Sequence, residues 1–320
     1  MELRQLRYFV KIADMGSMSR AALALHISQP SLSQQISQLE DEMGKPLLIR
    51  LPTGVRMTVE GEVFYRQALQ ILRQVDEVRA AVTAANEHLT GRVTIAMAHT
   101  QTAQYALPLI LEARKTYPQI DLEVFDNTSS DLLHGVASGR RDLGLLINED
   151  DAALLDSEPV LEEEILLISH PSQVPASSPV LRSELATLTL AVPAPEQVSR
   201  AQIEAIGGVP AEGGLKLEIP KNWIVANSAA IVRQAVLRGV AHAFQPWGAV
   251  RDELTQGLIC ATPILPRFVR TVYLSSARGA NASEATRAIR QLLMAVVQEQ
   301  IDKGFSRARY LSRPCTPPGT

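Results

Sequence analysis

Cysteine and aromatic residues are scarce in this chain of 320 residues. Its two cysteines, Cys260 and Cys315, stand in no metal-binding or redox spacing. So few thiols suit a reducing compartment, in which both stay unpaired, and they exclude a disulfide-stapled fold. Because aromatics make up only 4% of the chain, its cores must be built mainly from leucine, isoleucine, valine and alanine.

Long apolar runs are missing as well. No stretch approaches the roughly 18 consecutive apolar residues of a membrane-spanning helix. The first sixteen residues alternate charged with apolar side chains, unlike the uninterrupted apolar centre of a signal peptide. We therefore expect no membrane association and a cytoplasmic location.

Signatures of catalysis are also absent. The six histidines are scattered without an i, i+4 pair or an HExxH pattern, so no metal site is expected. GxSxG, P-loop and GxGxxG patterns are missing, which argues against a nucleophile elbow and a phosphate cradle. The run Glu162-Glu163-Glu164 is interpreted as a solvated charge run. We expect no catalytic residue, no metal and no cofactor.

The overall charge does not point to nucleic acid. The net charge is −3 with a pI of about 6.1, and residues 1–66 hold eight cationic against seven anionic side chains. Any affinity for DNA must therefore come from a few well-placed cations, from helix N-termini and from dimerisation. The length and the 46% of hydrophobic residues suffice for two or three domains with separate cores.

The N-terminal region carries the signals of three short helices. Apolar residues recur at helical spacing from Leu3 to Ala13, and Gly16 ends the run. A short alanine-rich helix follows, and after a three-residue break Ser28 can cap a third helix with Pro30 in its first turn. The order helix, short turn, capped helix is typical of a helix-turn-helix.

The third helix has one apolar and one neutral polar face. The apolar stripe steps by i, i+4, i+7 and i+11 through Leu32, Ile36, Leu39 and Met43. The opposite face carries Ser33, Gln34, Ser37 and Gln38. Amides and hydroxyls suit base edges in a major groove, whereas a solvent-facing helix usually carries Glu and Lys. A polar-faced helix in an ordinary bundle is the alternative.

A β-hairpin is predicted next. Residues 47–50 and 55–58 form two short extended runs across a turn at Pro52-Thr53-Gly54. Arg50 and Arg56, near the ends of this hairpin, would reach phosphates that flank the groove. A surface hairpin with two solvated arginines is the alternative. Thr58 then caps a further helix.

Together these segments resemble the DNA-binding domain of LysR-type transcriptional regulators. The likeness runs without a gap over about sixty residues, through Ala21-Ala22, 28–33, Leu39-Glu40, 47–50 and 57–61. Residues 8–12 and 47–50 are also similar to the nitrogen assimilation control subgroup. The resemblance implies an all-α winged helix-turn-helix over residues 1–58 that binds double-stranded promoter DNA, with RNA polymerase as a further partner. The implied DNA-binding residues are Ser28, Gln29, Pro30, Ser31, Ser33, Gln34, Arg50, Thr53 and Arg56.

A long linker helix is predicted over residues 59–90, which contain no proline. Its apolar residues step alternately by four and three through Phe64, Ala68, Ile71, Val75, Val78 and Val82. Such a seam is typical of a coiled coil, and a helix of this length would measure roughly 45–50 Å. The resemblance implies that it pairs two subunits into a homodimer, with homotetramers as a further step. A helix lying on its own domain is the alternative.

Strand and helix patterns alternate after Arg92. Apolar strands are predicted at 93–97, 120–125 and 143–147, which indicates an α/β domain with a mostly parallel sheet. The order resembles the two-lobed, periplasmic-binding-protein-like effector domain of LysR-type regulators, here 91–303. Lobe one is predicted to comprise about 91–162 and 268–303, and lobe two about 163–267. Residues 304–320 are expected to form a disordered tail.

A small-molecule effector site is expected between the lobes. In such sheets ligands bind at the carboxyl ends of the strands. Thr100, Gln101 and Thr102 follow the first strand, so their hydroxyl and N–H groups could hold a carboxylate, with a simple helix cap as the alternative. By the family resemblance they would face residues from three other loops across the cleft, namely Asn148, Gln197, Ser199 and Asn227.

We therefore predict a DNA-binding transcriptional regulator controlled by a small molecule. Two alternatives stay open at this point. One is a regulator that answers to no effector and acts through its abundance alone. The other is a solute-binding protein or an enzyme whose N-terminal bundle does not bind DNA. Salt-dependent binding to DNA separates this last class from the first two.

Overall fold

The computed structural model describes residues 1–83, 89–127, 129–147, 154–175, 178–192, 210–211, 214–215, 222–226 and 228–311. Two compact units divide the chain, namely Met1–Gly91 with Ser138–Arg140, and Arg92–Ala137 with Arg141–Thr320. We refer to them as the N-terminal unit and the effector unit. Within the described part of the chain, no helix has the length and apolar character that crossing a membrane requires.

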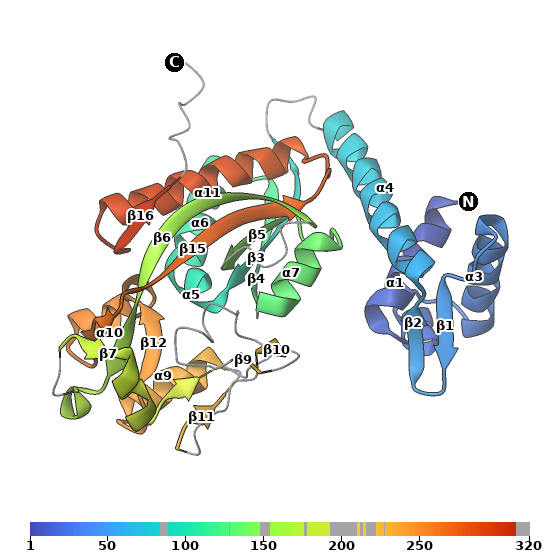
Figure 1. Cartoon of the computed structure of the whole chain (residues 1–320). Coiled ribbons are helices and arrows are strands. Elements are labelled where there is room, and N and C mark those ends of the chain that lie inside the picture. Colours follow the sequence, from blue (N-terminus) through green and yellow to red (C-terminus); the bar gives the residue numbers. More distant parts are fainter. Residues whose placement is uncertain are drawn as a thin grey trace. The chain divides into compact units, whose positions relative to one another are not determined.

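The N-terminal unit is a three-helix core followed by a hairpin and a long helix (Figure 1). Its elements are α1 (Leu3–Met15), α2 (Met18–Ala24), α3 (Gln29–Met43), β1 (Leu48–Leu51), β2 (Gly54–Met57) and α4 (Val59–Thr83). This order confirms the predicted winged helix-turn-helix, including the hairpin.

Local signals place the helix ends where the sequence predicts them. Gly16, with a left-handed φ of 59°, ends α1. The Ser28 hydroxyl accepts a hydrogen bond from the Ser31 N–H at 3.3 Å and caps α3, whose first turn holds Pro30. Between α2 and α3, His26 adopts a φ of 54°, a left-handed conformation that is uncommon outside glycine but is adopted more often by histidine than by most other residues. These features make the turn between α2 and α3 sharp.

The core of the N-terminal unit is built from the inner faces of these helices. Leu32, Ile36 and Leu39 of α3 are each 0% exposed, so the first three positions of the predicted apolar stripe are buried, whereas the fourth, Met43, is 37% exposed at the end of the helix. Phe64 of α4 meets Phe9 of α1 edge to face, with ring centroids 5.0 Å apart. Such a pair contributes about 0.5–1.5 kcal/mol beyond its buried area. The beginning of α4 therefore packs on its own unit.

The hairpin is held close to α4 by two neighbouring residues. The Thr58 hydroxyl donates to the Pro46 carbonyl at 2.8 Å and accepts from the Gly61 N–H at 2.9 Å, which confirms the predicted cap. A Cβ placed on Gly61 would lie 2.0 Å from the Leu47 carbonyl oxygen. Only glycine therefore allows α4 to approach the chain at the start of the hairpin this closely.

The effector unit begins with alternating strands and helices. These are β3 (Gly91–Ala98), α5 (His99–Gln101), the π-helical turn η1 (Thr102–Ala106), α6 (Leu107–Thr116), β4 (Ile120–Asn127), α7 (Ser129–Ala137), β5 (Leu143–Ile147) and β6 (Leu155–Ser169). Three elements close the chain, namely β15 (Phe268–Ala277), α11 (Glu284–Asp302) and β16 (Ala308–Tyr310).

Between β6 and β15 lie the short elements of lobe two. They are η2 (Pro171–Gln173), β7 (Val180–Leu181), η3 (Arg182–Thr187), β8 (Ala191–Val192), β9 (Pro210–Ala211), β10 (Gly214–Leu215), β11 (Ile224–Val225), α9 (Ala229–Leu237), β12 (Ala243–Pro246), η5 (Trp247–Val250), α10 (Arg251–Thr255), β13 (Cys260–Thr262) and β14 (Ile264–Leu265).

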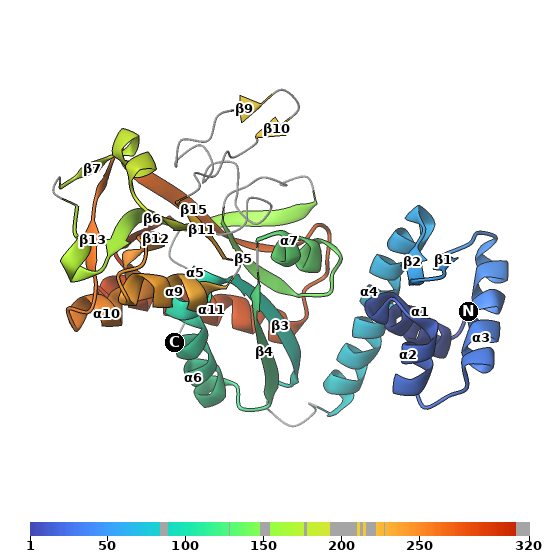
Figure 2. The same cartoon turned by 90° about the horizontal axis from the view of Figure 1, so that it is seen from below.

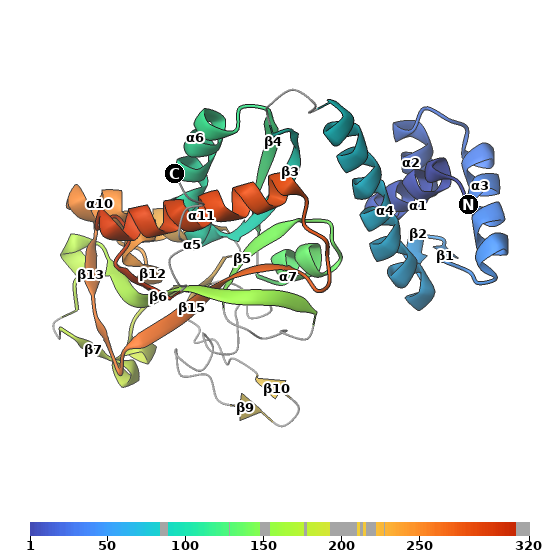
Figure 3. The same cartoon turned by 90° about the horizontal axis from the view of Figure 1, so that it is seen from above.

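One sheet runs through the effector unit in the order β12-β6-β15-β5-β3-β4. Strands β3 and β5 are parallel, but the pairings of β6 with β12, β13, β15 and β16 and of β15 with β5 are antiparallel, so among the described pairings of this sheet the prediction of a mostly parallel sheet holds only for β3 with β5. Leu132 and Val136 of α7 pack on one face of this lobe against Ala96 and Leu146. Helices α6 and α11 lie beside one another on the other face, as Figures 2 and 3 show from opposite sides.

Strands β6 and β15 are shared by the two lobes. The second half of β6 pairs with β12 and β13 of lobe two, from Ile165 to Ser169. Along its length β6 also pairs with β15, whose other edge joins β5 of lobe one. We call the middle of β6 (160–164) together with the first half of β15 (268–272) the hinge; both strands are labelled in Figure 1. The sequence prediction began the two strands only at about 165 and 270, so it missed much of this crossing.

The end of the chain differs from the prediction. A disordered tail was expected from residue 304, but Ser306 is buried and β16 pairs antiparallel with β6. The physical reason is the edge of β6, which offers backbone hydrogen bonds to Ala308–Tyr310. The prolines that suggested disorder lie at 314–318, outside the described residues.

Candidate functional site

The outer face of α3 carries neutral polar side chains. Gln34, Ser37 and Gln38 are exposed, and Ser33 is half-buried beside them. No acidic residue occupies the first turn of this helix. Burial of the apolar stripe therefore holds amides and hydroxyls outward along the N-terminal half of α3.

The residues at the start of α3 have two roles: Ser28 caps the helix, and those that follow it directly are exposed. Ser28 uses its hydroxyl to cap the helix, while Pro30 and Ser31 are exposed. The Gln29 side-chain oxygen accepts a hydrogen bond from the Ser19 hydroxyl of α2 at 3.1 Å. This bond fixes the side chain of Gln29 and leaves its amide nitrogen as a donor for other groups.

The two arginines of the hairpin lie on opposite faces of it. Arg50 is the register partner of Val55, and Arg56 is the partner of Ile49. Because paired residues share a face and neighbours alternate, Arg50 and Arg56 point away from each other. Both side chains are exposed, as is Thr53 in the turn.

Glu40 anchors the hairpin to α3. One of its carboxylate oxygens, Oε1, accepts hydrogen bonds from the backbone N–H groups of Leu47 at 2.8 Å and Leu48 at 3.0 Å. Sequence reasoning missed this role because it depends on how the chain folds back from α3. Such charge-assisted bonds are stronger than neutral ones, so Glu40 fixes where the hairpin starts.

The predicted dimerisation seam of α4 has two parts. Phe64 and Ala68 pack within their own unit, and Ala68 is 1% exposed. Ile71 and Val75 are half-buried, whereas Val78 is 64% exposed. The side chain of Val82 lies outside the described residues. Contact of the later positions with a second subunit stays a prediction.

In the effector unit, the helix after β3 contains an irregular turn. Residues 99–116 form a continuous helical segment whose turn η1 is π-helical. Single π turns within helices occur frequently at functional sites. Here the turn brings Gln104 and Tyr105 to the interior along with Gln101, which is 0% exposed.

A buried ion pair crosses the hinge. Glu163 of β6 and Arg270 of β15 are register partners, with side chains only 2% and 4% exposed. The guanidinium donates from Nε to Glu163 Oε1 at 2.8 Å and from Nη2 at 2.6 Å. Taking two charges out of water is costly, so a pair of this kind requires well-placed hydrogen bonds around it.

The interpretation of residues 162–164 as a solvated charge run was wrong for Glu163. Alternation along β6 turns Glu163 inward and its two neighbours outward. The outward carboxylates pair with exposed arginines, Glu162 with Arg309 and Glu164 with Arg267.

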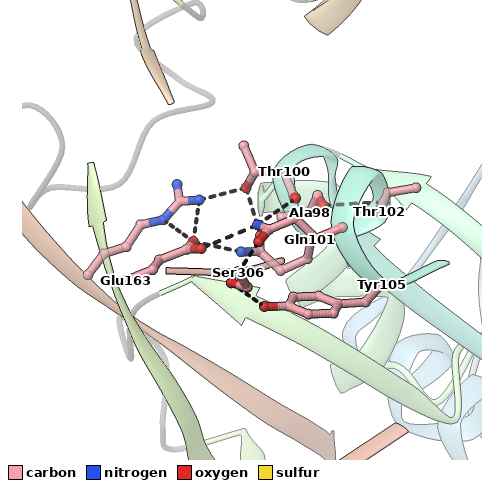
Figure 4. A network of polar contacts seen from close by, with 9 residues as sticks. Ala98, Thr100, Gln101, Thr102, Tyr105, Glu163 and Ser306 are labelled. Carbon is pink, nitrogen blue, oxygen red and sulfur yellow. Dashed lines mark hydrogen bonds and ion pairs between the residues drawn. The ribbon is translucent and has the colours of Figure 1, made fainter. Parts of the chain in front are cut away.

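A closed ring of hydrogen bonds joins the ion pair to the start of α5 (Figure 4). Arg270 Nη2 donates to the Thr100 hydroxyl at 2.6 Å, and that hydroxyl donates to Gln101 Oε1 at 2.8 Å. The Gln101 amide returns to Glu163 Oε1 at 2.8 Å. Two predicted effector residues are thus brought together, and both engage the hinge.

The third predicted residue of this loop faces another partner. The Thr102 hydroxyl lies 3.0 Å from Asp126 Oδ1, to which His99 Nδ1 also bonds at 2.6 Å. His99 and Asp126 stand at the carboxyl ends of β3 and β4, and sequence reasoning did not place them in the site. The other four predicted effector residues, Asn148, Gln197, Ser199 and Asn227, lie outside the described residues. Within the described chain no three His, Cys, Asp or Glu side chains form a metal-binding group.

Two protein families match the chain. Residues 3–62 match the family described as "Bacterial regulatory helix-turn-helix protein, lysR family". Residues 86–298 match the family described as "LysR substrate binding domain". The first match covers the helix-turn-helix and the hairpin, and the second covers most of the effector unit, while most of α4 lies between them.

Similar proteins agree with these families. The nitrogen assimilation regulatory protein nac of Escherichia coli is 28% identical over 311 residues, which cover 94% of this chain and 97% of that protein. Its namesake from Klebsiella aerogenes is 37% identical over 169 residues, which cover 52% of this chain and 55% of that protein.

The solved structures share the fold. A full-length OxyR variant from Pseudomonas aeruginosa has a TM-score of 0.71 at 22% identity, covering 98% of this chain and 99% of that one. Full-length LysG from Corynebacterium glutamicum with bound effector Arg has a TM-score of 0.63 at 19% identity, covering 93% and 99%. On the family and sequence matches the chain belongs to the LysR family of transcriptional regulators, with an N-terminal DNA-binding helix-turn-helix and a C-terminal effector-binding domain.

Proposed function

We propose that this regulator reads operator DNA with the outer face of α3 and that a small molecule bound between the lobes of the effector unit controls it. The observation that carries the first part is the uncharged, amide-rich face of α3, which is held outward because Leu32, Ile36 and Leu39 on the opposite face are buried. Because its target is chromosomal DNA, the protein works in the cytoplasm. RNA polymerase at the regulated promoter is a further partner.

Base reading falls to Gln29, Ser33 and Gln34. A glutamine amide can bond in bidentate fashion to adenine in the major groove, and a serine hydroxyl can serve several bases. Arg50 and Arg56, on opposite faces of the hairpin, neutralise phosphates on either side of it. Ser28, Pro30, Ser31 and Thr53 contribute close approach and backbone contacts.

Replacing Gln34 by alanine should relax base preference at one operator position. Loss of a bidentate pair removes about 1–3 kcal/mol of discrimination. Replacing Arg50 by alanine should instead weaken all sequences alike and reduce the slope of log affinity against log salt by about 0.9 for each bound subunit. Selection from a random DNA pool followed by fluorescence anisotropy measures both effects.

A matched control is Gln67→Ala, which removes an exposed glutamine of α4 and should leave base preference unchanged. If Gln34→Ala keeps the complete preference of the parent chain, α3 does not read bases through this residue. If the parent chain binds no genomic fragment at low salt, the whole DNA-reading proposal fails.

The proposal includes pairing of two subunits through α4. The later seam positions Ile71, Val75 and Val78 leave apolar surface on this helix, and Val78 is largely exposed. Apolar residues at spacings of four and three favour a partner helix. A homodimer so formed presents two recognition helices to two half-sites, and dimers pair further into a tetramer.

The effector site centres on the start of α5. Thr100 and Thr102 stand where β3 ends, the edge at which ligands bind in sheets of this type. They supply hydroxyl and N–H groups suited to a small carboxylate or amide. Asn148, Gln197, Ser199 and Asn227 complete the proposed site from the other loops.

A thermal-shift screen of small carboxylates and amides tests this part. A compound at a hundred times its Kd stabilises the native state by about 2.7 kcal/mol, which raises the melting temperature by several degrees. The shift should be lost in Thr100→Val and kept in Thr116→Val, which changes an exposed threonine of α6. If no compound shifts the parent chain, a regulator that acts through abundance alone is favoured.

A further inference from the structure

The segment after α11 lies against the hinge. We call residues 305–311 the C-terminal strap. Its β16 pairs with the middle of β6, Ala308 opposite Glu163 and Tyr310 opposite Leu161. The Leu311 N–H extends this pairing to the Val160 carbonyl at 2.8 Å. The strap therefore lies along the part of β6 about which the lobes would turn.

Ser306 of the strap also reaches into lobe one. It is 4% exposed, and its hydroxyl donates to Gln104 Oε1 at 3.0 Å while accepting from the Tyr105 hydroxyl at 3.0 Å (Figure 4). Burial raises the pKa of Tyr105, and the charge of Glu163 adds to this effect, so the phenol keeps its proton as a donor. The Gln104 amide in turn donates to Glu163 Oε2 at 3.3 Å.

Two side chains join the strap to lobe two. The Arg307 guanidinium lies 4.5 Å from the ring centroid of Trp247 in η5. Arg251, at the start of α10, lies 4.3 Å from the ring of Phe305. Gly248 shows how tight this junction is, because an added Cβ would lie 2.1 Å from Gln104 Oε1 and 3.2 Å from the Phe305 carbonyl oxygen.

We propose that the C-terminal strap fixes the angle between the two lobes, and that Ser306 is a positioning residue for the polar groups at the effector site. The inference rests on the effector control proposed above. This short segment touches the hinge, lobe one and lobe two at once. A rotation of one lobe against the other must therefore slide β16 along β6, pull Ser306 from Gln104 or separate Arg307 from Trp247.

The strap also links this angle to the site itself. Ser306 orients Gln104, and Gln104 shares the carboxylate of Glu163 with Gln101. Any displacement of Ser306 is thereby passed to the ring that holds Thr100. A ligand that engages Thr100 and a strap that holds the lobes act on one connected set of hydrogen bonds.

Spin-label distances between the lobes test the strap without effector or DNA. The labels are attached to cysteines introduced by Gln291→Cys on α11 and Gln234→Cys on α9, both at exposed positions. The full chain also carries Cys260→Ser and Cys315→Ser, so that no other thiol is labelled. Excess unlabelled chain suppresses distances between subunits. In the double variant Ser306→Ala with Arg307→Ala, the mean distance should shift, or its distribution broaden, by more than about 2 Å.

The matched control is Arg309→Ala, which removes an exposed arginine of the same strap that pairs with Glu162 on β6. It should keep the distance distribution of the parent chain, as should a chain that ends after Leu311. A chain that ends after Gly304 should show the larger change, and if it does not fold the double variant carries the test.

An unchanged distance distribution in the double variant would overturn the proposal that the strap fixes the angle between the lobes. This holds even if the melting temperature falls, because a segment that only stabilises the fold would lower the melting temperature without changing the distances. The effector proposal fails separately, through the ligand screen. Shifted distances without any binding compound would support the strap and contradict effector control.

Discussion

Replacing Arg270 by methionine should lower the free energy of unfolding of the protein's effector unit by about 3–5 kcal/mol. The change leaves the carboxylate of Glu163 buried at the hinge without its cation, and methionine fills similar space without supplying a donor. The Thr100 hydroxyl also loses the hydrogen bond that it accepts from Arg270 Nη2. Urea unfolding followed by circular dichroism measures the loss, with the midpoint concentration and the slope determined separately.

A second substitution should recover much of this loss. In Arg270→Met with Glu163→Met no buried charge remains, and apolar replacement of an entire buried pair is often neutral or better. Recovery should be incomplete because the Gln101 amide loses its acceptor, at about 1–3 kcal/mol for a group left unsatisfied, while the Gln104 amide keeps only its bond to the Thr100 carbonyl.

The surface arginine Arg267 supplies the matched control. It forms a similar pair with Glu164, but its side chain is 67% exposed. Arg267→Met should therefore change stability little, since water replaces the lost partner. Equal losses in Arg267→Met and Arg270→Met would show that burial of the hinge pair has no energetic consequence.

Charges in the seam of α4 should separate the subunits. In Val75→Glu with Val78→Glu, four carboxylates would meet across a paired helix, which is strongly unfavourable in an apolar interface. We expect monomers in sedimentation velocity. Affinity for an operator with two half-sites should fall by about 10²–10⁴-fold, because the second half-site is no longer bound within one assembly.

Binding to a single half-site distinguishes this effect from damage to the N-terminal unit. The double variant should bind one half-site as the parent chain does, since Val75 and Val78 are not among the α4 residues in the core cluster of the N-terminal unit, which are Phe64, Tyr65 and Leu69. Gln74→Glu adds charge at an exposed position beside the seam and should leave the dimer intact. An intact dimer in the double variant would refute the assignment of the seam.

Local signals explain what could be predicted from the sequence. Caps, periodicity and turn residues act within a few positions, so the order of α1 to α4 with the intervening hairpin followed directly. The apolar stripe of α3 is likewise a property of neighbouring turns. The strands of lobe one were predictable because they are continuous apolar runs bounded by turns.

Contacts between distant residues explain what could not be predicted. Glu40 meets the start of β1 only after the chain reverses, and the strap finds β6 only after lobe two, β15 and α11 have intervened. For Glu163 a signal did exist. Leu161 and Ile165 are apolar and two positions away, so strand alternation places Glu163 on their inward face. The charge of its two neighbours obscured that pattern.

The close approach at Gly61 fixes where α4 begins relative to the hairpin. Because the first turn of α4 lies directly on the carbonyl of Leu47, the start of the hairpin has little room to shift against this helix. In an assembly joined through α4, each residue of helix sets about 1.5 Å of length and about 100° of rotation between the joint and the hairpin. The spacing of half-sites that two such subunits can span is therefore fixed by where along α4 the subunits meet.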